Sequence, residues 1–435
     1  MTTHPNTLYT DKNQKMKITK FSTLFFSEKI KNRRPLFISL FSIFASLPIV
    51  FSSLTYADNG FQHWINEFKK MALANNISSS TFDIAFKTIN TIDQEVLKKA
   101  AYQPEFVDMA WEYFDNRIHD DAILEGKQQA KQWEQWLPKI EKRFGVNRNF
   151  LLAIWSMESS YGKVLTNKDV MRDTIRSLAT LAYADPKRKK YAHAQLIAAM
   201  KILQSGEIHR SQLVGSWAGA LGHTQFIPSS YLIYAIDMDG SGRSDIWNSI
   251  PDALATAANL LHMNGWQSNL TWGIEVKLPN NKQLPENWLS FEEWKELGVQ
   301  HAHGKPFPSL SEQAILKFPD GPKGPAFLVT KNFFVIKRYN NADRYAFAVG
   351  LLADRIAGHP KLFQDWNRPF KPMTFKERIE LQSRLATLGD YEGEIDGKIG
   401  TASKKAIKAF QLRHGLEANG YPSYETLSHI RKQHP

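Results

Sequence analysis

The sequence predicts a mainly α-helical protein with a small β-containing part and a separate helical unit at its C-terminal end. Residues 58–265 are dominated by apolar side chains at helical spacing, and residues 267–335 contain strand-like segments between Pro- and Gly-rich turns. A proline-containing stretch at 359–373 then precedes a compact final segment. A chain of 435 residues is long enough for two or three such domains.

The helical part begins with the segment "FQHWINEFKKMAL", whose apolar residues Phe61, Trp64, Ile65 and Phe68 recur on one helical face. In "IPDALATAANLLHMNGW", Pro251 marks a helix start and Gly265 a helix end. The segment "ADRYAFAVGLLADRIAG" predicts a further helix that ends at Gly358. Between these helices, "TWGIEVKLP" (271–279) and "AFLVTKNFFVIKRY" (326–339) predict strands.

The composition excludes several classes of protein. The chain has no cysteine, which excludes disulfides, thiolate metal sites, thiol catalysis and a lipid-modified N-terminal Cys. Half of its net charge of +12 lies in residues 1–57, so the remainder is moderately basic, as suits an anionic polymer or surface. We find no Lys/Arg stripe interleaved with stacking aromatics, and therefore expect no nucleic-acid partner.

The N-terminal region predicts a secretory signal peptide over residues 1–57. Its basic cluster ends at Arg34, and the run from Pro35 to Leu54 carries no charge. Small residues at Thr55 and Ala57 favour cleavage before Asp58. We therefore expect export to the periplasm. The alternative is an uncleaved inner-membrane anchor, since about 20 apolar residues can span a bilayer.

The segment "LLAIWSMESSYGK" (151–163) places one acidic residue at the end of an apolar helical run. Ile154 and Trp155 precede Glu158 by about one helical turn, and an apolar wall of this kind disfavours a carboxylate and raises the pKa of the carboxyl. A carboxyl that stays protonated near neutral pH can act as a general acid. A solvated surface Glu is the other interpretation of this residue alone.

Two further segments offer polar groups. "SWAGALGHTQFIPSSY" (216–231) combines backbone-thinning glycines with the hydrogen-bonding side chains of Ser216 and Gln225, which could form a groove floor for sugar hydroxyls or a tight helix–loop crossing. "DMDGSGRSDIWN" (237–248) matches the EF-hand frame at positions 1, 3, 5 and 9, and has the expected glycine, Gly242, at position 6. Asn248 replaces the closing Glu, Asp252 lies nearby, and an Asx-stabilised turn is the alternative to a metal site.

Together these motifs identify a family resemblance. "MESSYG", "GALGHTQFIPSS", "DMDGSGRSDIWNS" and "KRYNNADRYAFAVGLLADRI" resemble the lytic murein transglycosylases of the B type, over about residues 60–358. "GEIDGKIGTASKKAIKAFQ" in the final segment resembles a peptidoglycan-binding domain of the three-helix type. The resemblance implies a lysozyme-like α+β catalytic domain at 58–358, a linker at 359–373 and a peptidoglycan-binding domain at 374–435.

The resemblance also implies roles for individual residues. Glu158 matches the single catalytic acid/base of the family, and the substrate-contacting positions correspond to Ser216, Gln225, Tyr339, Asn340 and Tyr345. The resemblance implies that no cofactor is required. It also implies a structural Ca²⁺, known in part of the family, at a loop whose ligands would be Asp237, Asp239, Ser241, the Arg243 carbonyl and Asp252. This loop has one residue more before Asp252 than the family pattern. The partners implied are peptidoglycan glycan strands, and we expect a monomer.

The reaction implied by the resemblance cleaves the β-1,4 bond between N-acetylmuramic acid and N-acetylglucosamine and leaves a 1,6-anhydromuramoyl end. Two alternatives remain open. A hydrolytic muramidase would need a second carboxylate, for which Asp343 is the candidate. A non-catalytic wall-binding protein would need only the final domain.

Overall fold

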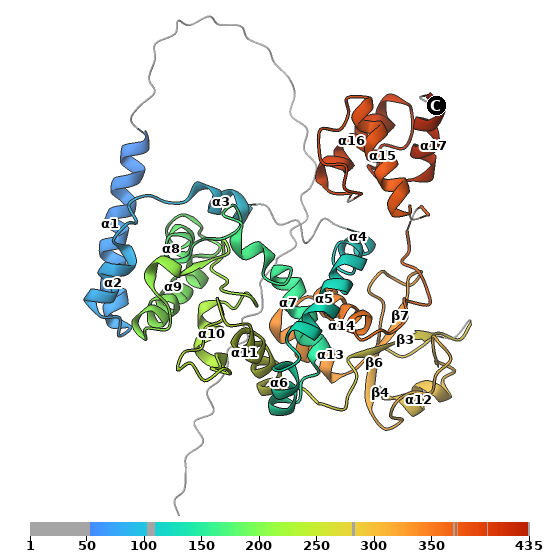
Figure 1. Cartoon of the computed structure of the whole chain (residues 1–435), viewed down its shortest axis with the longest axis horizontal. Helices are drawn as coiled ribbons and strands as arrows, with labels where there is room; N and C mark the ends of the chain where they lie inside the picture. The colour runs from blue at the N-terminus through green and yellow to red at the C-terminus, as the bar shows by residue number, and fades with distance from the viewer. Residues whose placement is uncertain are drawn as a thin grey trace, which may run out of the picture. The chain divides into compact units, whose positions relative to one another are not determined.

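The computed structural model describes residues 53–101, 109–280, 283–368, 370–371, 373–397 and 399–433. The described helices before the sheet are α1 (Ser53–Ala74), α2 (Ser79–Phe86), α3 (Gln94–Ala101), α4 (Ala110–Asp115), α5 (Asp120–Gln132), α6 (Leu137–Phe144), α7 (Arg148–Ser159), α8 (Thr174–Ala184), α9 (Lys189–Gln204), α10 (Pro228–Tyr234) and α11 (Ile250–Met263). A short strand pair, β1 (Arg172–Asp173) and β2 (Val214–Gly215), interrupts them. Figure 1 shows α8 and α9 side by side.

The expected leader falls mostly outside the described residues. Residues 1–52 are not among them, and α1 begins at Ser53, before the expected cleavage point. Within the part of the chain that the structure describes, we find no helix with the length and hydrophobicity needed to cross a membrane.

A small antiparallel sheet follows α11. Its strands are β3 (Gly273–Lys277), β4 (Leu289–Ser290), β5 (Gln300–His301), β6 (Gln313–Lys317) and β7 (Ala326–Val329), in the order β4-β6-β7-β3-β5. The helix α12 (Phe291–Glu296) packs against this sheet and buries Phe291 and Trp294. Figure 1 shows β3, β6 and β7 lying side by side. The expected β-containing part is therefore confirmed.

One strand prediction was wrong in its second half. Only Ala326–Val329 of the segment 326–339 is a strand, and the chain continues as the helix α13 (Lys331–Tyr339). Thr330 caps this helix by accepting a hydrogen bond from the backbone N–H of Asn332. The buried residues of α13 follow 3.6-residue spacing, and β-branched and aromatic side chains fit a helix when tertiary packing favours one. The correction matters because α13 delivers Tyr339 to the site.

One continuous hydrophobic core joins the helices on either side of the sheet. The run from Leu151 to Trp155 on α7 is almost fully buried, and α7 packs against α14 (Asp343–Ile356). Trp272 at the start of β3 contacts the aromatic rings of Phe327, Phe333 and Phe347, and thereby ties the sheet to α13 and α14. This core fixes the relative positions of α7, α13 and α14.

The segment expected as a linker is partly bound to the domain that precedes it. The buried carboxylate of Glu275 accepts hydrogen bonds from the backbone N–H groups of Phe363 and Gln364, at 2.7 and 2.8 Å. The ring of Trp366 stacks on Phe114 with centroids 4.3 Å apart. Residues 359–368 thus form a strap along this domain. They also line a cavity of about 630 Å³ whose walls include none of the expected site residues.

The described residues of the final unit form three helices, as expected: α15 (Phe375–Thr387), α16 (Thr401–Arg413) and α17 (Tyr424–Gln433). Figure 1 draws them as one compact group. Leu381, Ile407 and Leu427 lie at its centre with no exposed surface. The buried side-chain amide of Gln382 connects α15 to α16 and to the loop between them. Its oxygen accepts a hydrogen bond from the backbone N–H of Gly397 in that loop, and its nitrogen donates to the Ser403 hydroxyl on α16.

Candidate active site

The acidic residue at the centre of the site is carried by α7. Asn147 caps the start of this helix by accepting the backbone N–H of Asn149, and Glu158 stands half-buried one residue before its end. The chain then turns through three consecutive residues in the left-handed region, namely Ser160, Tyr161 and Gly162, with φ of 49°, 58° and 87°. Left-handed non-glycine residues are costly and concentrate at functional sites.

This turn is held by specific contacts. The Tyr161 hydroxyl donates to the carbonyl of Ala122 on α5, at 2.8 Å. The backbone N–H of Gly162 donates to the Ser159 hydroxyl oxygen at 2.9 Å. A Cβ atom at Gly162 would come within 2.5 Å of the His223 ring, so both the backbone conformation and the available space require glycine. The end of α7 is thus fixed relative to its neighbours.

Two stacked tyrosines stand beside the acid. The Tyr345 hydroxyl donates a hydrogen bond to Oε1 of Glu158 at 2.6 Å. Tyr345 lies in the first turn of α14 and is buried, and its ring lies nearly parallel to that of Tyr339 with centroids 6.3 Å apart. Burial, followed by the charge of Glu158, raises the pKa of both phenols well above the ordinary value. Both tyrosines are therefore neutral hydrogen-bond donors at physiological pH.

The Gly-rich segment forms a compact loop next to these tyrosines. It leaves β2, and Leu221 bridges both Gly215 and Phe226. Gly222 has φ of 65°, and a Cβ atom there would lie 2.4 Å from the Ile246 carbonyl oxygen, which enforces glycine. Tyr339 donates its hydroxyl hydrogen to the Thr224 carbonyl at 2.5 Å. The loop is thereby attached to α13.

The other four residues that we expect to contact substrate differ in their surroundings. Gln225 is half-buried with φ of 49°, and its amide donates to the Gly222 carbonyl at 2.8 Å. Ser216 is half-buried, and its hydroxyl oxygen accepts the backbone N–H of Ala220 at 3.1 Å. Asn340 is exposed directly after Tyr339, at the C-terminal end of α13. Tyr345 differs from these in being buried with its hydroxyl on Glu158.

Asp343, the candidate second carboxylate, is held by two lysines. Its two oxygens lie 2.7 Å from Lys317 Nζ and 2.6 Å from Lys337 Nζ. Burial acts to raise the pKa of Asp343, but the hydrogen bonds and charges of both lysines lower it overall. Asp343 is therefore an ion-paired carboxylate at the start of α14, not a base free to activate water.

Sequence reasoning did not foresee the contact between Trp155 and His223. The indole Nε1–H of Trp155 donates to Nδ1 of His223 at 3.1 Å, across 68 residues of chain. Burial lowers the pKa of His223 to about 4, against opposing contributions from Asp245 and the backbone of Trp247. The signal was a lone histidine inside a segment of small and polar residues.

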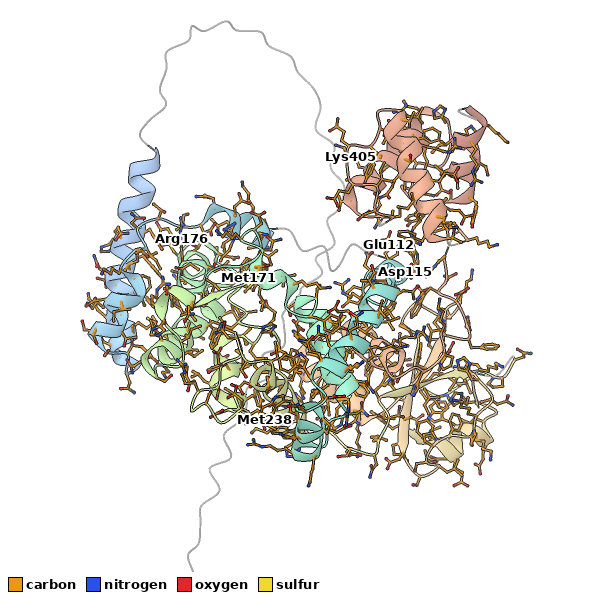
Figure 2. All side chains as sticks on the ribbon, viewed as in Figure 1. Glu112, Asp115, Met171, Arg176, Met238 and Lys405 are labelled. Carbon is orange, nitrogen blue, oxygen red and sulfur yellow. The ribbon has the colours of Figure 1, made fainter. Side chains whose placement is uncertain are left out.

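The acidic loop between α10 and α11 brings oxygen ligands together. Carboxylate oxygens of Asp237, Asp239 and Asp252 all lie within 4.8 Å of one another. The Ser241 hydroxyl donates to the Arg243 carbonyl at 3.2 Å. Met238, which Figure 2 labels, lies in this loop, and its backbone N–H donates to the Asp252 carboxylate at 2.8 Å.

This donor set fits a hard cation. The three carboxylates that converge offer only oxygen atoms, which are the ligands that Ca²⁺ prefers. Asp252 is fully buried, and burial raises the pKa of its carboxyl while backbone N–H groups of Met238, Asp245 and Asp239 oppose the shift. Hydrogen bonds to these N–H groups also make Asp252 a structural anchor of the loop.

Comparison with known proteins gives the family. The Transglycosylase SLT domain family matches residues 60–354, and the Putative peptidoglycan binding domain family matches residues 376–430. The membrane-bound lytic murein transglycosylase B of Escherichia coli strain K12 is 27% identical over 274 residues, which are 62% of this chain and 73% of that protein.

Solved structures agree. SltB3 from Pseudomonas aeruginosa in complex with NAG-anhNAM-pentapeptide is 43% identical and superimposes with a TM-score of 0.67, over 85% of this chain and 99% of that one. The Escherichia coli lytic transglycosylase Slt35 in complex with bulgecin A is 25% identical with a TM-score of 0.57, over 69% of this chain and 93% of that one. The lysozyme-like fold expected from the sequence is confirmed. The chain belongs to the Transglycosylase SLT domain family and is a lytic transglycosylase that acts on peptidoglycan.

Proposed function

We propose that the chain cleaves the β-1,4 bond between N-acetylmuramic acid and N-acetylglucosamine with Glu158 as its only acid/base, and that it leaves a 1,6-anhydromuramoyl end. The observation that carries this proposal is the difference between the surroundings of Glu158 and those of Asp343. Glu158 is half-buried and oriented by Tyr345, whereas Asp343 is paired with Lys317 and Lys337. One orientable carboxyl suits a reaction in which the substrate supplies its own nucleophile.

The proton moves twice through the same carboxyl. Protonated Glu158 donates to the glycosidic oxygen as the bond from that oxygen to C1 of the muramoyl sugar breaks, through an oxocarbenium-like transition state. The resulting carboxylate then takes the proton of the C6 hydroxyl, and O6 attacks C1 of the same sugar. Intramolecular attack gains from proximity and needs no water.

The surrounding side chains have separate tasks in this proposal. Ser216, Gln225, Tyr339 and Asn340 contact the sugars, as the family resemblance implies. Tyr345 was expected among these sugar-contacting residues, but its hydroxyl donates a hydrogen bond to Glu158. We therefore propose that Tyr345 orients the carboxyl of Glu158. A hydrogen bond to Oε1 restricts rotation of the carboxyl and stabilises the carboxylate form that follows the first proton transfer.

The complex of SltB3 with NAG-anhNAM-pentapeptide supports this reaction, because that relative is similar over most of this chain. The test is mass spectrometry of muropeptides released from purified sacculi by the wild type and by Glu158→Gln. We expect products lighter by one water than the hydrolysed fragments, and none from Glu158→Gln. Reducing muramic acid ends would identify a hydrolase, and sacculus binding without release would leave a wall-binding protein.

For the acidic loop we propose a structural Ca²⁺ held by Asp237, Asp239, Ser241, the Arg243 carbonyl and Asp252. The three carboxylates already converge, and a cation would relieve their mutual repulsion. Bound there, Ca²⁺ would stabilise the loop that packs against Gly222 and would take no part in the reaction. A relative of the same fold, Slt35 of Escherichia coli, has been solved in complex with calcium.

For the location we propose the periplasm, reached through cleavage of a signal peptide at residues 1–57. The basic cluster, the uncharged run and the small residues before Asp58 support this. N-terminal sequencing of the protein from osmotic-shock fluid tests it, with Asp58 expected as the first residue. Recovery of the intact chain with the inner membrane would show an anchor instead.

In either location, the three-helix unit would hold the enzyme on peptidoglycan strands.

A further inference from the structure

His223 connects the helix that carries the acid to the loop that carries Gln225. The indole Nε1–H of Trp155 donates to His223 Nδ1 at 3.1 Å, and the two rings meet edge to face with centroids 5.6 Å apart. Trp155 is 2% exposed and lies one helical turn before Glu158 on α7. An Nδ1 atom that accepts a hydrogen bond carries no proton, so the imidazole is neutral and holds its hydrogen on Nε2.

The backbone of His223 makes a second connection to α7. Its carbonyl accepts a hydrogen bond from the Ser159 hydroxyl at 2.6 Å, and Ser159 follows Glu158 directly. Its N–H donates to the Ile246 carbonyl at 3.0 Å, which attaches the same residue to the acidic loop. His223 therefore contacts α7 on both sides of Glu158 and is itself held from behind.

The contacts form a closed circuit around the carboxyl. On one side, Trp155 and Ser159 connect α7 to His223. The next residue, Thr224, accepts the hydroxyl of Tyr339, whose ring stacks on Tyr345. The Tyr345 hydroxyl returns to Glu158. Removal of one member of a closed circuit should loosen the position of the carboxyl without dismantling the core beneath it.

We propose that His223 is a positioning residue, whose neutral imidazole accepts from Trp155 and sets the placement of Glu158 relative to the Gln225 loop. This inference rests on the proposed role of Glu158 as the acid. Proton donation to a glycosidic oxygen needs hydrogen-bond distance, and a shift of about 1 Å in a catalytic group can cost about 100-fold in rate. The effect is therefore expected in kcat, with substrate contacts and KM largely preserved.

Two substitutions that are both branched at Cγ separate positioning from packing. In His223→Asn, the side-chain oxygen occupies the place of Nδ1 and can still accept from Trp155. In His223→Leu, the same space is filled without any acceptor. A purely structural role would make the two variants lose stability and activity together, whereas positioning by the hydrogen bond predicts that Asn restores what Leu loses.

The experiment compares wild type, both variants, Trp155→Phe and the double variant Trp155→Phe/His223→Leu on soluble glycan strands, well below the lowest unfolding temperature. We expect kcat to fall about 10- to 100-fold for His223→Leu, with KM within about twofold and partial recovery for His223→Asn. Trp155→Phe and His223→Leu break the same hydrogen bond. The double variant should therefore be no slower than the slower of these two single variants. The Trp155 indole N–H resonance should be protected from exchange in wild type and His223→Asn, and exposed to exchange in His223→Leu.

Two results would overturn the proposal: unchanged kcat in His223→Leu, or equal losses in the Asn and Leu variants while the indole resonance stays protected in Asn. Failure of the proposed function would look different. In that case Glu158→Gln would itself retain turnover, whereas an inactive Glu158→Gln beside a fully active His223→Leu would reject only the role of His223.

Discussion

The hydroxyl of Tyr345 donates a hydrogen bond to Oε1 of Glu158 at 2.6 Å, although the two residues are 187 positions apart in the chain. Tyr345 is 4% exposed and sits in the first turn of α14, which packs against α7. A buried phenol is a rigid donor, because its ring is fixed by packing and only the hydroxyl rotates. Tyr345 therefore orients the carboxyl of Glu158 from within the protein.

Removal of this hydroxyl should slow the reaction. In Tyr345→Phe we expect kcat to fall about 10- to 100-fold, since a hydrogen bond to a charged group contributes about 1.5–3 kcal/mol. KM should change little, because the ring stays in place against Tyr339. The measurement is steady-state turnover of soluble glycan strands, combined with thermal unfolding.

A matched control is Tyr231→Phe. Its hydroxyl is also buried and donates to a carbonyl, that of Ser244, at 2.7 Å, but it does not contact Glu158. This variant should lose stability and keep its kcat. Equal kcat in Tyr345→Phe and the wild type would show that the carboxyl needs no orientation from Tyr345.

Asp343 should be dispensable for the chemistry. In Asp343→Asn we expect the same anhydromuramoyl products and a kcat within about twofold of wild type, with a stability loss of about 1 kcal/mol or less, because the lysine pairs are partly exposed. Muropeptide mass spectrometry and thermal unfolding measure both, with the exposed Asp169→Asn as the control for loss of one charge. Loss of all turnover, or loss of a reducing-end product found in the wild type, would restore Asp343 as a catalytic base.

Calcium should stabilise the fold through the acidic loop. At about ten times its Kd, a bound ion raises the free energy of unfolding by about 1.4 kcal/mol, so the Tm should rise with added Ca²⁺ and fall with a chelator. Asp237→Asn should abolish this shift while keeping the loop, since Asp252 remains its buried anchor. Asp169→Asn should keep the shift. A Tm that does not respond to Ca²⁺ in the wild type would rule out the site.

Sequence patterns predicted the elements whose signals are local. The apolar run before Glu158, the glycine at 222 and the Pro251 helix start follow from spacing and backbone sterics, and the structure confirms these elements. The prediction of a strand beyond Val329 was wrong. The residues of α13 can form either a strand or a helix, and packing against Trp272 and Phe347 favours the helix.

The contacts that define the site were beyond such patterns. Tyr345 meets Glu158, and Trp155 meets His223, only because the core places α14 and the Gly-rich loop against α7. A sequence shows which residues can donate or accept, but pairs 68 and 187 positions apart depend on the whole fold. For the same reason, the pairing of Asp343 with Lys317 and Lys337 could not be foreseen.

Stability should depend on pH through His223. Burial, the largest influence, lowers its pKa in the folded protein to about 4, although Asp245 and the Trp247 backbone oppose this, whereas an unfolded histidine titrates near 6.5. Below about pH 6.5, His223 becomes protonated in the unfolded chain but stays neutral in the folded protein. The free energy of unfolding should therefore decline from pH 6.5 to about 4 and then level off. The full contribution to the free energy of unfolding is about 3 kcal/mol. Equilibrium urea unfolding of wild type and His223→Asn from pH 7 to 4 isolates it, because other titrating groups are common to both. The stability difference between them should shift in favour of His223→Asn as the pH falls, and parallel curves would contradict a neutral buried imidazole.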